Sequence, residues 1–273
     1  MKLSIITINW NNADGLKRTM ESVLSQTTKD FEYIVVDGVS TDGSIKVMNH
    51  FVEKLTSNGV QITAKSEPDT GLYNAMNKGV RMAAGDYVLM LNSGDWLADN
   101  DVIGKILPHL DGTDIVQGNI IRFKNGRPRV DRGYGKSDIN FIDVQQGHFL
   151  HQASFCKRNL FEKYGYFDES YKIDGDTVFY IKALGFGNAS FKYVDLNIAY
   201  FEQGGRSSEE NQDWRLRREE EFRRWSTEFF SPRLWATCIE SDKKNKLYDK
   251  LHRHKWAWNC VMLLVKIINS AEK

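Results

Sequence analysis

Polar and acidic residues follow four apolar runs in the first hundred positions, and Asp95 is the clearest case. It comes after the run VLML and the polar triplet Asn92, Ser93 and Gly94. A carboxylate repels a phosphate, whereas a divalent cation binds carboxylate and phosphate oxygens together. Asp95 therefore predicts a site where Mn²⁺ or Mg²⁺ holds a diphosphate. As an alternative, Asp95 caps a helix that begins near Ala98 or simply forms a turn.

The other three runs end in further polar side chains. These are Thr7, Asn9 and Trp10 at the end of LSIITINW, Asp37 at the end of EYIVVD, and Glu67 and Asp69 after VQITAKS. The carboxyl ends of parallel strands lie along one edge of a sheet, where ligands bind. We therefore expect these side chains to line one pocket with Asp95, although Glu67 and Asp69 also suit a turn around Pro68.

Two acids, Asp174 and Asp176, begin a predicted helix over residues 174–187. At positions i and i+2 they point to different sides, so we do not expect them to act as a pair. A positioned carboxylate can remove a proton from a hydroxyl. An ordinary Asp titrates near pH ~3.9 and is a weak base at neutral pH unless burial raises its pKa. Both acids also suit a helix start, where Asp174 is the better N-cap.

The elements that must position these residues alternate through the first 120 positions. Apolar runs predict strands at 3–8, 32–37, 60–66 and 86–91, and amphipathic stretches predict helices at 13–26, 42–55 and 70–84. Such an alternation indicates an α/β fold with a mostly parallel sheet covered by helices on both faces. Farther along, we expect strands at 114–123, 148–155 and 189–201, a short helix ending at Gly165, and the helix 174–187 closed by Gly185.

The composition is that of an ordinary globular protein, with 41% hydrophobic and 27% charged residues among 273. Lys plus Arg (37) nearly equals Asp plus Glu (36), which argues against a general nucleic-acid binder. Cys156, Cys238 and Cys260 are odd in number and lack zinc spacing, so they predict reduced thiols in a cytoplasmic protein. The N-terminal apolar run is too short for a signal peptide, and no window reaches the roughly 20 apolar residues of a membrane span.

The character of the chain changes after about residue 207. Residues 207–225 are densely charged with helical spacing, which indicates a solvated helix. Residues 243–255 carry six Lys or Arg against one Asp, and a Trp-rich apolar segment follows to residue 268. This pattern is typical of a helix that lies on an anionic membrane surface, here the inner face of the cell membrane. The alternative is a helix that packs on its own domain or on a second subunit of a homo-oligomer.

Six blocks, taken in order, resemble family 2 glycosyltransferases with the GT-A fold. They are SIITINWNN, VVDGVSTDGS, SEPDTGLYNAMNKG, LNSGD, HQASF and GYFDESYKIDGD, and they span roughly residues 1–207. The third block is similar to a form common in bacterial transferases that build capsule, exopolysaccharide or O-antigen chains. The resemblance implies a nucleotide-binding half over 1–120, an acceptor and catalytic half over 121–207, and a helical C-terminal extension over 208–273.

The resemblance implies that Thr7, Asn9 and Asp37 hold the base and ribose of a UDP-linked sugar, with Asp37 able to accept the imide N–H of uracil. Glu67 and Asp69 would line the same pocket. Gly38 stands where the family usually has a second acid, so one nucleotide contact is missing or comes from elsewhere.

The family's Asp-x-Asp metal motif reads Ser93-Gly94-Asp95 here. Asp95 stands at the position of the last acid of the motif, the usual metal ligand. Ser93 replaces the first acid, and its hydroxyl could still bond the ribose. With one protein carboxylate, diphosphate oxygens and waters would complete the shell of Mn²⁺ or Mg²⁺. His148 and His151 are candidates for a further metal ligand or an acceptor contact. Alternatively, each is a polar side chain whose hydrogen bonds are made within the protein.

The resemblance aligns Asp176 with the family's base, with Asp174 as the competitor. The base would deprotonate an acceptor hydroxyl that attacks from the face opposite the leaving diphosphate, which inverts the anomeric centre. The acceptor would be a glycan or a lipid-linked glycan. Arg206 follows Gly204 and Gly205, so it could close over the diphosphate and exclude water, or lie in a hinge.

Two other functions compete with this one. A nucleotidyltransferase would share the sheet and the metal-bound phosphates, but NWNNADG lacks the expected Gly-rich basic loop. A non-catalytic glycan-assembly partner would keep the fold without turnover, and the residues at Gly38 and Ser93 leave that reading open. A dinucleotide-binding dehydrogenase lacks support, because no GxGxxG is present.

Overall fold

The structure is a computed structural model that describes residues 2–124, 126–146, 148–201 and 212–271. The chain divides into two compact units, residues 1–222 and 223–273. The predicted boundary at residue 207 lies outside the described residues, as do Gly204, Gly205 and Arg206.

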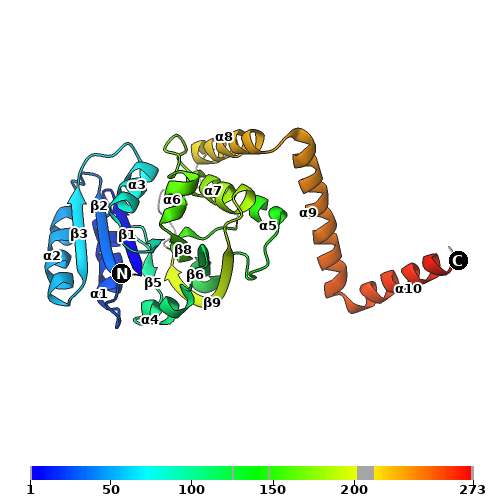
Figure 1. The fold of residues 1–273 in the computed structure, drawn as a ribbon, viewed down its shortest axis with the longest axis horizontal. Coiled ribbons are helices and arrows are strands. Elements are labelled where there is room, and N and C mark those ends of the chain that lie inside the picture. Colours follow the sequence, from blue (N-terminus) through cyan, green and yellow to red (C-terminus); the bar gives the residue numbers. More distant parts are fainter. Residues whose placement is uncertain (1, 125, 147, 202–211, 272–273) are drawn as a thin grey trace. The chain divides into compact units, whose positions relative to one another are not determined.

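The first half of the larger unit is a parallel sheet with helices on both faces (Figure 1). Its strands run in the order β3 (Gln61–Ser66), β2 (Glu32–Asp37), β1 (Leu3–Asn9), β4 (Tyr87–Met90), and its helices are α1 (Ala13–Leu24), α2 (Ser44–Ser57) and α3 (Leu72–Met82). The predicted strands and helices of this half are confirmed to within three residues at each end. The α3 helix packs so closely that a Cβ on Gly79 would lie 2.3 Å from Cγ2 of Ile6.

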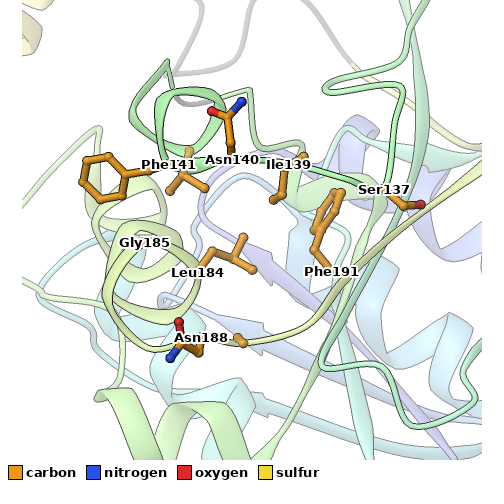
Figure 2. A pocket seen from close by; sticks show the side chains of 10 residues that line it. Ser137, Ile139, Asn140, Phe141, Leu184, Gly185, Asn188 and Phe191 are labelled. Carbon is orange, nitrogen blue, oxygen red and sulfur yellow. The ribbon is translucent and has the colours of Figure 1, made fainter. Parts of the chain in front are cut away.

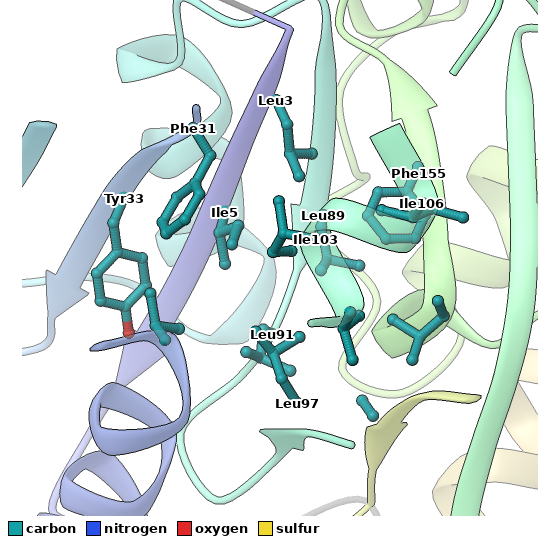
Figure 3. Packing of buried hydrophobic residues seen from close by; sticks show 14 of the residues in the cluster. Leu3, Ile5, Phe31, Tyr33, Leu89, Leu91, Leu97, Ile103, Ile106 and Phe155 are labelled. Atoms are coloured by element: carbon teal, nitrogen blue, oxygen red, sulfur yellow. The ribbon is translucent and has the colours of Figure 1, made fainter. Parts of the chain in front are cut away.

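The core beneath α1 and α2 is built from alternate residues of the strands. Figure 3 shows Leu3 and Ile5 of β1 beside Phe31 and Tyr33, with Leu89 of β4 continuing the layer. All five side chains are essentially inaccessible to solvent. Burial of this apolar layer is the main force that fixes the register of the parallel strands.

The second half of the sheet mixes parallel and antiparallel pairs, which completes the mixed α/β fold. From β4 the order continues β8 (Ser154–Lys157), β6 (Ile115–Lys124), β9 (Phe191–Tyr200), β5 (Trp96–Leu97), with β7 (Arg127–Asp131) paired to β6. Short helices α4 (Val102–Ile106), α5 (Phe141–Gln146) and α6 (Asn159–Tyr164) lie between these strands in sequence. The short helix expected to end at Gly165 is confirmed, since Gly165 is the C-cap of α6.

Two sequence predictions in this half are wrong in part. Residues His151–Ala153 form a 3₁₀ turn before β8, closed by the bond from the Ala153 N–H to the Leu150 carbonyl, where a strand over 148–155 is expected. The helix predicted over 174–187 consists of α7 (Gly175–Tyr180) followed by a π-helical segment, Ile181–Phe186.

That helix ends at Gly187 and not at Gly185. A Cβ on Gly187 would lie 2.3 Å from Cε1 of Tyr164 and 2.7 Å from the Ala183 carbonyl oxygen, so only glycine fits there. The place where the helix ends is therefore fixed by a tertiary contact that the local sequence does not show.

The C-terminal region is helical, as predicted. The helix α8 (Gln212–Phe229) begins in the larger unit and ends in the smaller one, which also contains α9 (Pro232–Arg253) and α10 (Lys255–Ala271). Within the smaller unit, Trp225, Phe230 and Trp235 pack edge to face. None of the helices in the described ranges is long and apolar enough to span a bilayer.

Candidate active site

The polar strand ends meet at one edge of the sheet, as the alternation predicts. Asn9 pairs with Asp37 across β1 and β2, and Asp37 pairs with Ser66 across β2 and β3. The chain beyond β4 continues alongside β1, because the Ser93 N–H donates to the Ile8 carbonyl at 3.0 Å. The loops that follow four parallel strands thus share one edge.

Asp37 is fully buried and anchors the loop after β2. Its oxygens accept hydrogen bonds from Asn9 Nδ2 (2.8 Å), Ser66 Oγ (2.9 Å), and both the backbone N–H and the hydroxyl of Ser40 (2.9 and 2.6 Å). Burial alone would raise the pKa of Asp37, but these hydrogen bonds lower it below its usual value. The carboxylate is therefore ionised at neutral pH, and it holds the loop after β2 against β1 and β3.

Asp69 occupies the space that a side chain at Gly38 would need. A Cβ on Gly38 would lie 2.5 Å from Asp69 Oδ2 and 3.0 Å from Cδ1 of Trp10. The other oxygen of Asp69 accepts the Gly71 N–H at 2.9 Å, which holds the carboxylate in place. An acid therefore stands close to the position of the missing second acid, supplied by the loop after β3.

Thr7 and Glu67 lie at this edge with other partners. The Thr7 hydroxyl is buried, donates to the Leu91 carbonyl at 2.7 Å and accepts from Tyr33 at 2.8 Å. Glu67 forms ion pairs with Lys65 and, at 3.1 Å, with Lys78, and hydrogen bonds from both lysines lower its pKa.

Asp95 is buried at the end of a turn that α1 pins in place. Thr19 accepts the Gly94 N–H at 3.0 Å and donates to the Asp95 carbonyl at 2.6 Å, while Gly94 takes a φ of 106° that favours glycine. The alternative of a helix cap is wrong, because Asp95 is followed by β5 and the nearest helix, α4, has Asp101 at its N-cap. The backbone of the turn that carries Asp95 is therefore held rigidly by α1.

His151 links this turn to Asp176. The Nδ1 atom of His151 lies 2.9 Å from Asp176 Oδ2, and its Nε2 atom lies 3.4 Å from Asn92 Nδ2. The two side chains of the pair are only 20% and 15% exposed. Asp176 Oδ1 also accepts from its own helix at Thr177 N (2.9 Å) and from the Tyr73 hydroxyl (3.1 Å).

Residues 4–165 match the sequence model of glycosyl transferase family 2. The chain belongs to this family. A PGL/p-HBAD biosynthesis glycosyltransferase of Mycobacterium tuberculosis is 31% identical over 209 residues, which cover 75% of this chain and 78% of that relative. An uncharacterized glycosyltransferase of the same species is 32% identical over 185 residues, covering 66% of this chain and 68% of the relative.

Solved structures agree on the fold of this family 2 glycosyltransferase. S. aureus TarS in complex with UDP-GlcNAc matches with a TM-score of 0.64 at 19% identity, over 80% of this chain and 64% of TarS. A mannosyltransferase from Pyrobaculum calidifontis, solved with GDP-Man and Mn²⁺, matches with a TM-score of 0.59 at 19% identity, over 80% of this chain and 60% of that one. The chain thus spans less than two thirds of either structure, and the likeness shows the GT-A fold.

Two further predicted site residues of this glycosyltransferase, His148 and Asp174, have no hydrogen bond to Asp37 or Asp176 among those described. His148 is exposed, with its ring edge-on to Tyr134 at 6.0 Å between centroids. Asp174 occupies the N-cap position of α7, but its side chain makes no capping hydrogen bond. In the first turn of this helix, the Asp176 carboxylate accepts the Thr177 N–H.

Sequence reasoning did not assign roles to the α3 residues that hold the Asp176 segment. Asn77 donates to the Phe167 carbonyl and to Glu169, both at 2.9 Å, and its oxygen accepts the Phe167 N–H at 3.0 Å. The single hydroxyl proton of Tyr73 is shared between the Ile173 carbonyl at 2.6 Å and Asp176 Oδ1 at 3.1 Å. The blocks LYNAMNKG and GYFDESYKIDGD therefore bind each other, which their presence in one family pattern could have suggested.

The turn of Asp95 offers two oxygen ligands of the kind a hard divalent cation binds, the Asp95 carboxylate and the Asn92 amide. Among the described residues, no three His, Cys, Asp or Glu side chains are grouped as a metal site. Asn92 Oδ1 is buried and accepts no hydrogen bond from the described part of the chain. A hard cation accepts both amide and carboxylate oxygens, and Asn92 and Asp95 belong to one turn, closed by the bond from the Asp95 N–H to the Asn92 carbonyl at 2.9 Å.

A separate hollow of about 310 Å³ lies at the far end of the π-helical segment from Asp176 (Figure 2). Phe141, Leu184 and Phe191 form apolar walls, and the amides of Asn140 and Asn188 stand at its rim. None of the predicted site residues lines it.

The His151–Asp176 pair should make the stability of the protein depend on pH. Burial lowers the pKa of His151, but the hydrogen bond and the charges of Asp176 and Asp95 raise it above its usual value. Burial raises the pKa of Asp176, but the bond from His151 lowers it below its usual value. The stabilisation is present between about pH 4 and pH 6.5, is lost as pH falls through the lowered pKa of Asp176, and is lost as pH rises through the raised pKa of His151.

We therefore expect His151→Gln to lower the free energy of unfolding more at pH 6 than at pH 9, by roughly 1 kcal/mol. Denaturant unfolding at the two pH values measures this difference. His148→Gln is the matched control, because His148 is exposed and should show the wild-type pH dependence. An equal loss at both pH values in His151→Gln would show that no ion pair contributes.

Proposed function

We propose that this family 2 glycosyltransferase moves a sugar from a UDP-linked donor to a hydroxyl of a glycan or lipid-linked glycan, with inversion at the anomeric carbon. The observation that carries the proposal is that His151 contacts both Asp176 and Asn92, so it joins the helix of Asp176 to the turn that contains Asp95, 81 positions earlier in sequence. The donor class is supported by TarS, solved with UDP and with UDP-GlcNAc. The block SEPDTGLYNAMNKG, similar to a form common in bacterial polysaccharide transferases, favours assembly of a bacterial surface polysaccharide.

The nucleotide would lie on the loops after β1, β2 and β3. The indole of Trp10 is 51% exposed beside Asp69, and an aromatic face of this kind binds a flat base by stacking. Asn9 and Asp37 hold the loop under the base, and the Ser93 hydroxyl would reach the ribose. Thr7 and Glu67 complete the predicted nucleotide residues at the same edge, and Arg206 is proposed for the diphosphate.

Asp95 would hold Mn²⁺ or Mg²⁺ against the diphosphate, with Asn92 Oδ1 as a second oxygen donor. The solved mannosyltransferase with GDP-Man and Mn²⁺ supports a metal in this fold. When bound, the ion would offset the negative charge that develops on the departing nucleotide. Its two protein donors leave most of its coordination sites to phosphate oxygens and water.

Asp176 would accept the proton of the acceptor hydroxyl as that oxygen bonds to the anomeric carbon. The bond from that carbon to the diphosphate breaks at the same time, and its electron pair leaves with the nucleotide. Asp176 is ionised at neutral pH, so it can accept the proton. Burial raises its pKa, but its hydrogen bonds outweigh burial and lower the pKa, so Asp176 is a weaker base than the sequence predicts for a buried Asp. His151 bonds one oxygen of the carboxylate and Tyr73 and Thr177 bond the other, so its orientation is fixed and a remaining lone pair would accept the proton.

A screen of nucleotides and nucleotide-sugars by thermal shift, with and without Mn²⁺ or Mg²⁺, tests donor and metal together. UDP-sugars with metal should raise Tm by about 5 °C at about 100 times Kd. GDP-sugars in the same buffer are the matched control. A shift only with GDP-sugars would overturn the donor assignment.

Sugar transfer is favoured over nucleotidyl transfer by the family match. A non-catalytic partner with the same fold would bind the donor and never consume it. Slow metal-dependent hydrolysis of the UDP-sugar without acceptor is therefore expected of the enzyme. Binding with no hydrolysis and no transfer to any glycan would instead identify a non-catalytic partner.

The C-terminal helices would bring the enzyme to the inner face of the membrane. In α10 the Trp256 side chain is 73% exposed and Leu263 and Leu264 are exposed as well. The preceding helix carries four exposed lysines, Lys243, Lys244, Lys246 and Lys250. Apolar and basic residues side by side in sequence suit an anionic lipid surface, while a second copy of the chain is the competing partner.

Replacing these four lysines with Gln should weaken binding to phosphatidylglycerol vesicles by about a hundredfold or more, since each contributes about 1 kcal/mol. Vesicle sedimentation measures this. The matched control replaces four exposed lysines of the larger unit, Lys17, Lys46, Lys54 and Lys124. Equal binding by both variants, or a dimer in place of lipid binding, would contradict the membrane assignment.

A further inference from the structure

The carboxylate of Glu221 is buried against the segment that leads to Asp176. Glu221 belongs to α8, is 8% exposed, and lies within the larger unit. Its Oε1 accepts the N–H of Lys172 at 2.7 Å, and its Oε2 accepts the N–H groups of Ile173 and Asp174, both at 2.9 Å. Three consecutive backbone donors thus converge on one side chain that is 47 to 49 positions away in sequence.

A second partner of this segment is Tyr73 of α3, beside the contact of His151 with Asp176. Its hydroxyl binds the carbonyl of Ile173 and the carboxylate of Asp176, and its ring lies against Gly175, where a Cβ would come within 2.7 Å of Cε2. Residues 172–176 are therefore held through their N–H groups by Glu221 and through a carbonyl and a side chain by Tyr73. Among these contacts, only those of Glu221 hold the N–H groups of residues 172–174.

The geometry requires a carboxylate at position 221. Successive N–H groups that point at a common centre form a concavity that binds anions. A carboxylate has enough lone pairs for three donors, whereas Gln offers one oxygen and an NH₂ group that would face further donors. By contrast, the neighbouring residue Glu220 is exposed.

We propose that Glu221 is a positioning residue for sugar transfer, which makes α8 part of the catalytic apparatus. It acts through the backbone of residues 172–174, which sets where the Asp176 carboxylate lies relative to the acceptor hydroxyl. This inference rests on the proposed role of Asp176 as base. The nucleotide pocket, built by the loops after β1, β2 and β3, has no contact with Glu221 among those described.

Glu221→Gln should lower kcat by about a hundredfold, the effect of moving a reacting group by about 1 Å, with KM for the donor and UDP affinity within about twofold of wild type. Glu220→Gln should behave as wild type. Glu221→Asp keeps the charge on a shorter side chain and should recover part of the rate. In the Asp176→Asn background, Glu221→Gln should cause no further loss, because both changes act on one step.

Amide exchange in the free protein gives a readout independent of activity. The N–H groups of residues 172, 173 and 174 should exchange at least about tenfold faster in Glu221→Gln than in Glu220→Gln. If the wild type transfers sugar and Glu221→Gln matches it, the inference fails and the proposed function stands. If kcat and UDP affinity fall together, or the losses add in the double variant, Glu221 is a general stability residue. A wild type that transfers nothing while these amides remain protected would overturn the proposed function instead.

Discussion

Asp176→Asn should reduce the rate of sugar transfer by about 10²- to 10⁴-fold, the usual contribution of a positioned base. UDP affinity in Mn²⁺ should stay within about twofold of wild type, because Asp176 lies on α7 and not on the nucleotide loops. Asn keeps the size of the side chain and can still accept from Tyr73 and Thr177, so the fold should survive. Steady-state kinetics and calorimetric titration of UDP measure the two quantities.

Two matched variants make this result specific. Asp174→Asn tests the competing base two positions away and should retain most of the activity. Asp138→Asn removes an exposed acid elsewhere in the same unit and should be neutral. Turnover by Asp176→Asn near the wild-type rate, together with a large loss in Asp174→Asn, would move the base to Asp174.

Asp95→Ala should abolish the effect of metal on donor binding. We expect UDP affinity in Mn²⁺ to fall by about a hundredfold, or about 2.7 kcal/mol, because the bridge between carboxylate and diphosphate is lost. In EDTA the variant and the wild type should bind UDP equally weakly. Asp99→Ala, which removes an exposed acid four positions on, is the control and should keep the full metal effect.

The comparison of the two buffers decides how Asp95 acts. If Asp95→Ala lost affinity equally in Mn²⁺ and in EDTA, Asp95 would contact the nucleotide or support the turn without a metal. Unchanged affinity in both buffers would remove Asp95 from the donor site altogether.

The parallel half of the sheet could be predicted from sequence because both of its signals are local. Continuous apolar runs such as EYIVVD and the helical spacing of Leu16, Met20 and Val23 are set by burial on one face of each element. The parallel arrangement then follows, and with it the meeting of Asn9, Asp37 and the loop of Asp95 at one edge.

The details of the site depend on contacts between distant segments, which a local pattern cannot show. Nothing around Gly38 indicates that Asp69 fills its space, and nothing around Asp176 indicates His151 or Tyr73 as its partners. Glu221 looks like one more acid in a solvated helix, because the run REEEF contains three. Its burial is decided by three backbone N–H groups nearly fifty positions away.

The central claim is that a divalent cation at Asp95 joins the protein to the diphosphate of the donor. A crystal grown with UDP and Mn²⁺, measured at the manganese absorption edge, tests it directly. The account predicts an anomalous peak about 2.0–2.6 Å from an Asp95 oxygen, with diphosphate oxygens on its other side. A UDP molecule bound away from Asp95, or bound at this edge with no manganese beside that carboxylate, would contradict it.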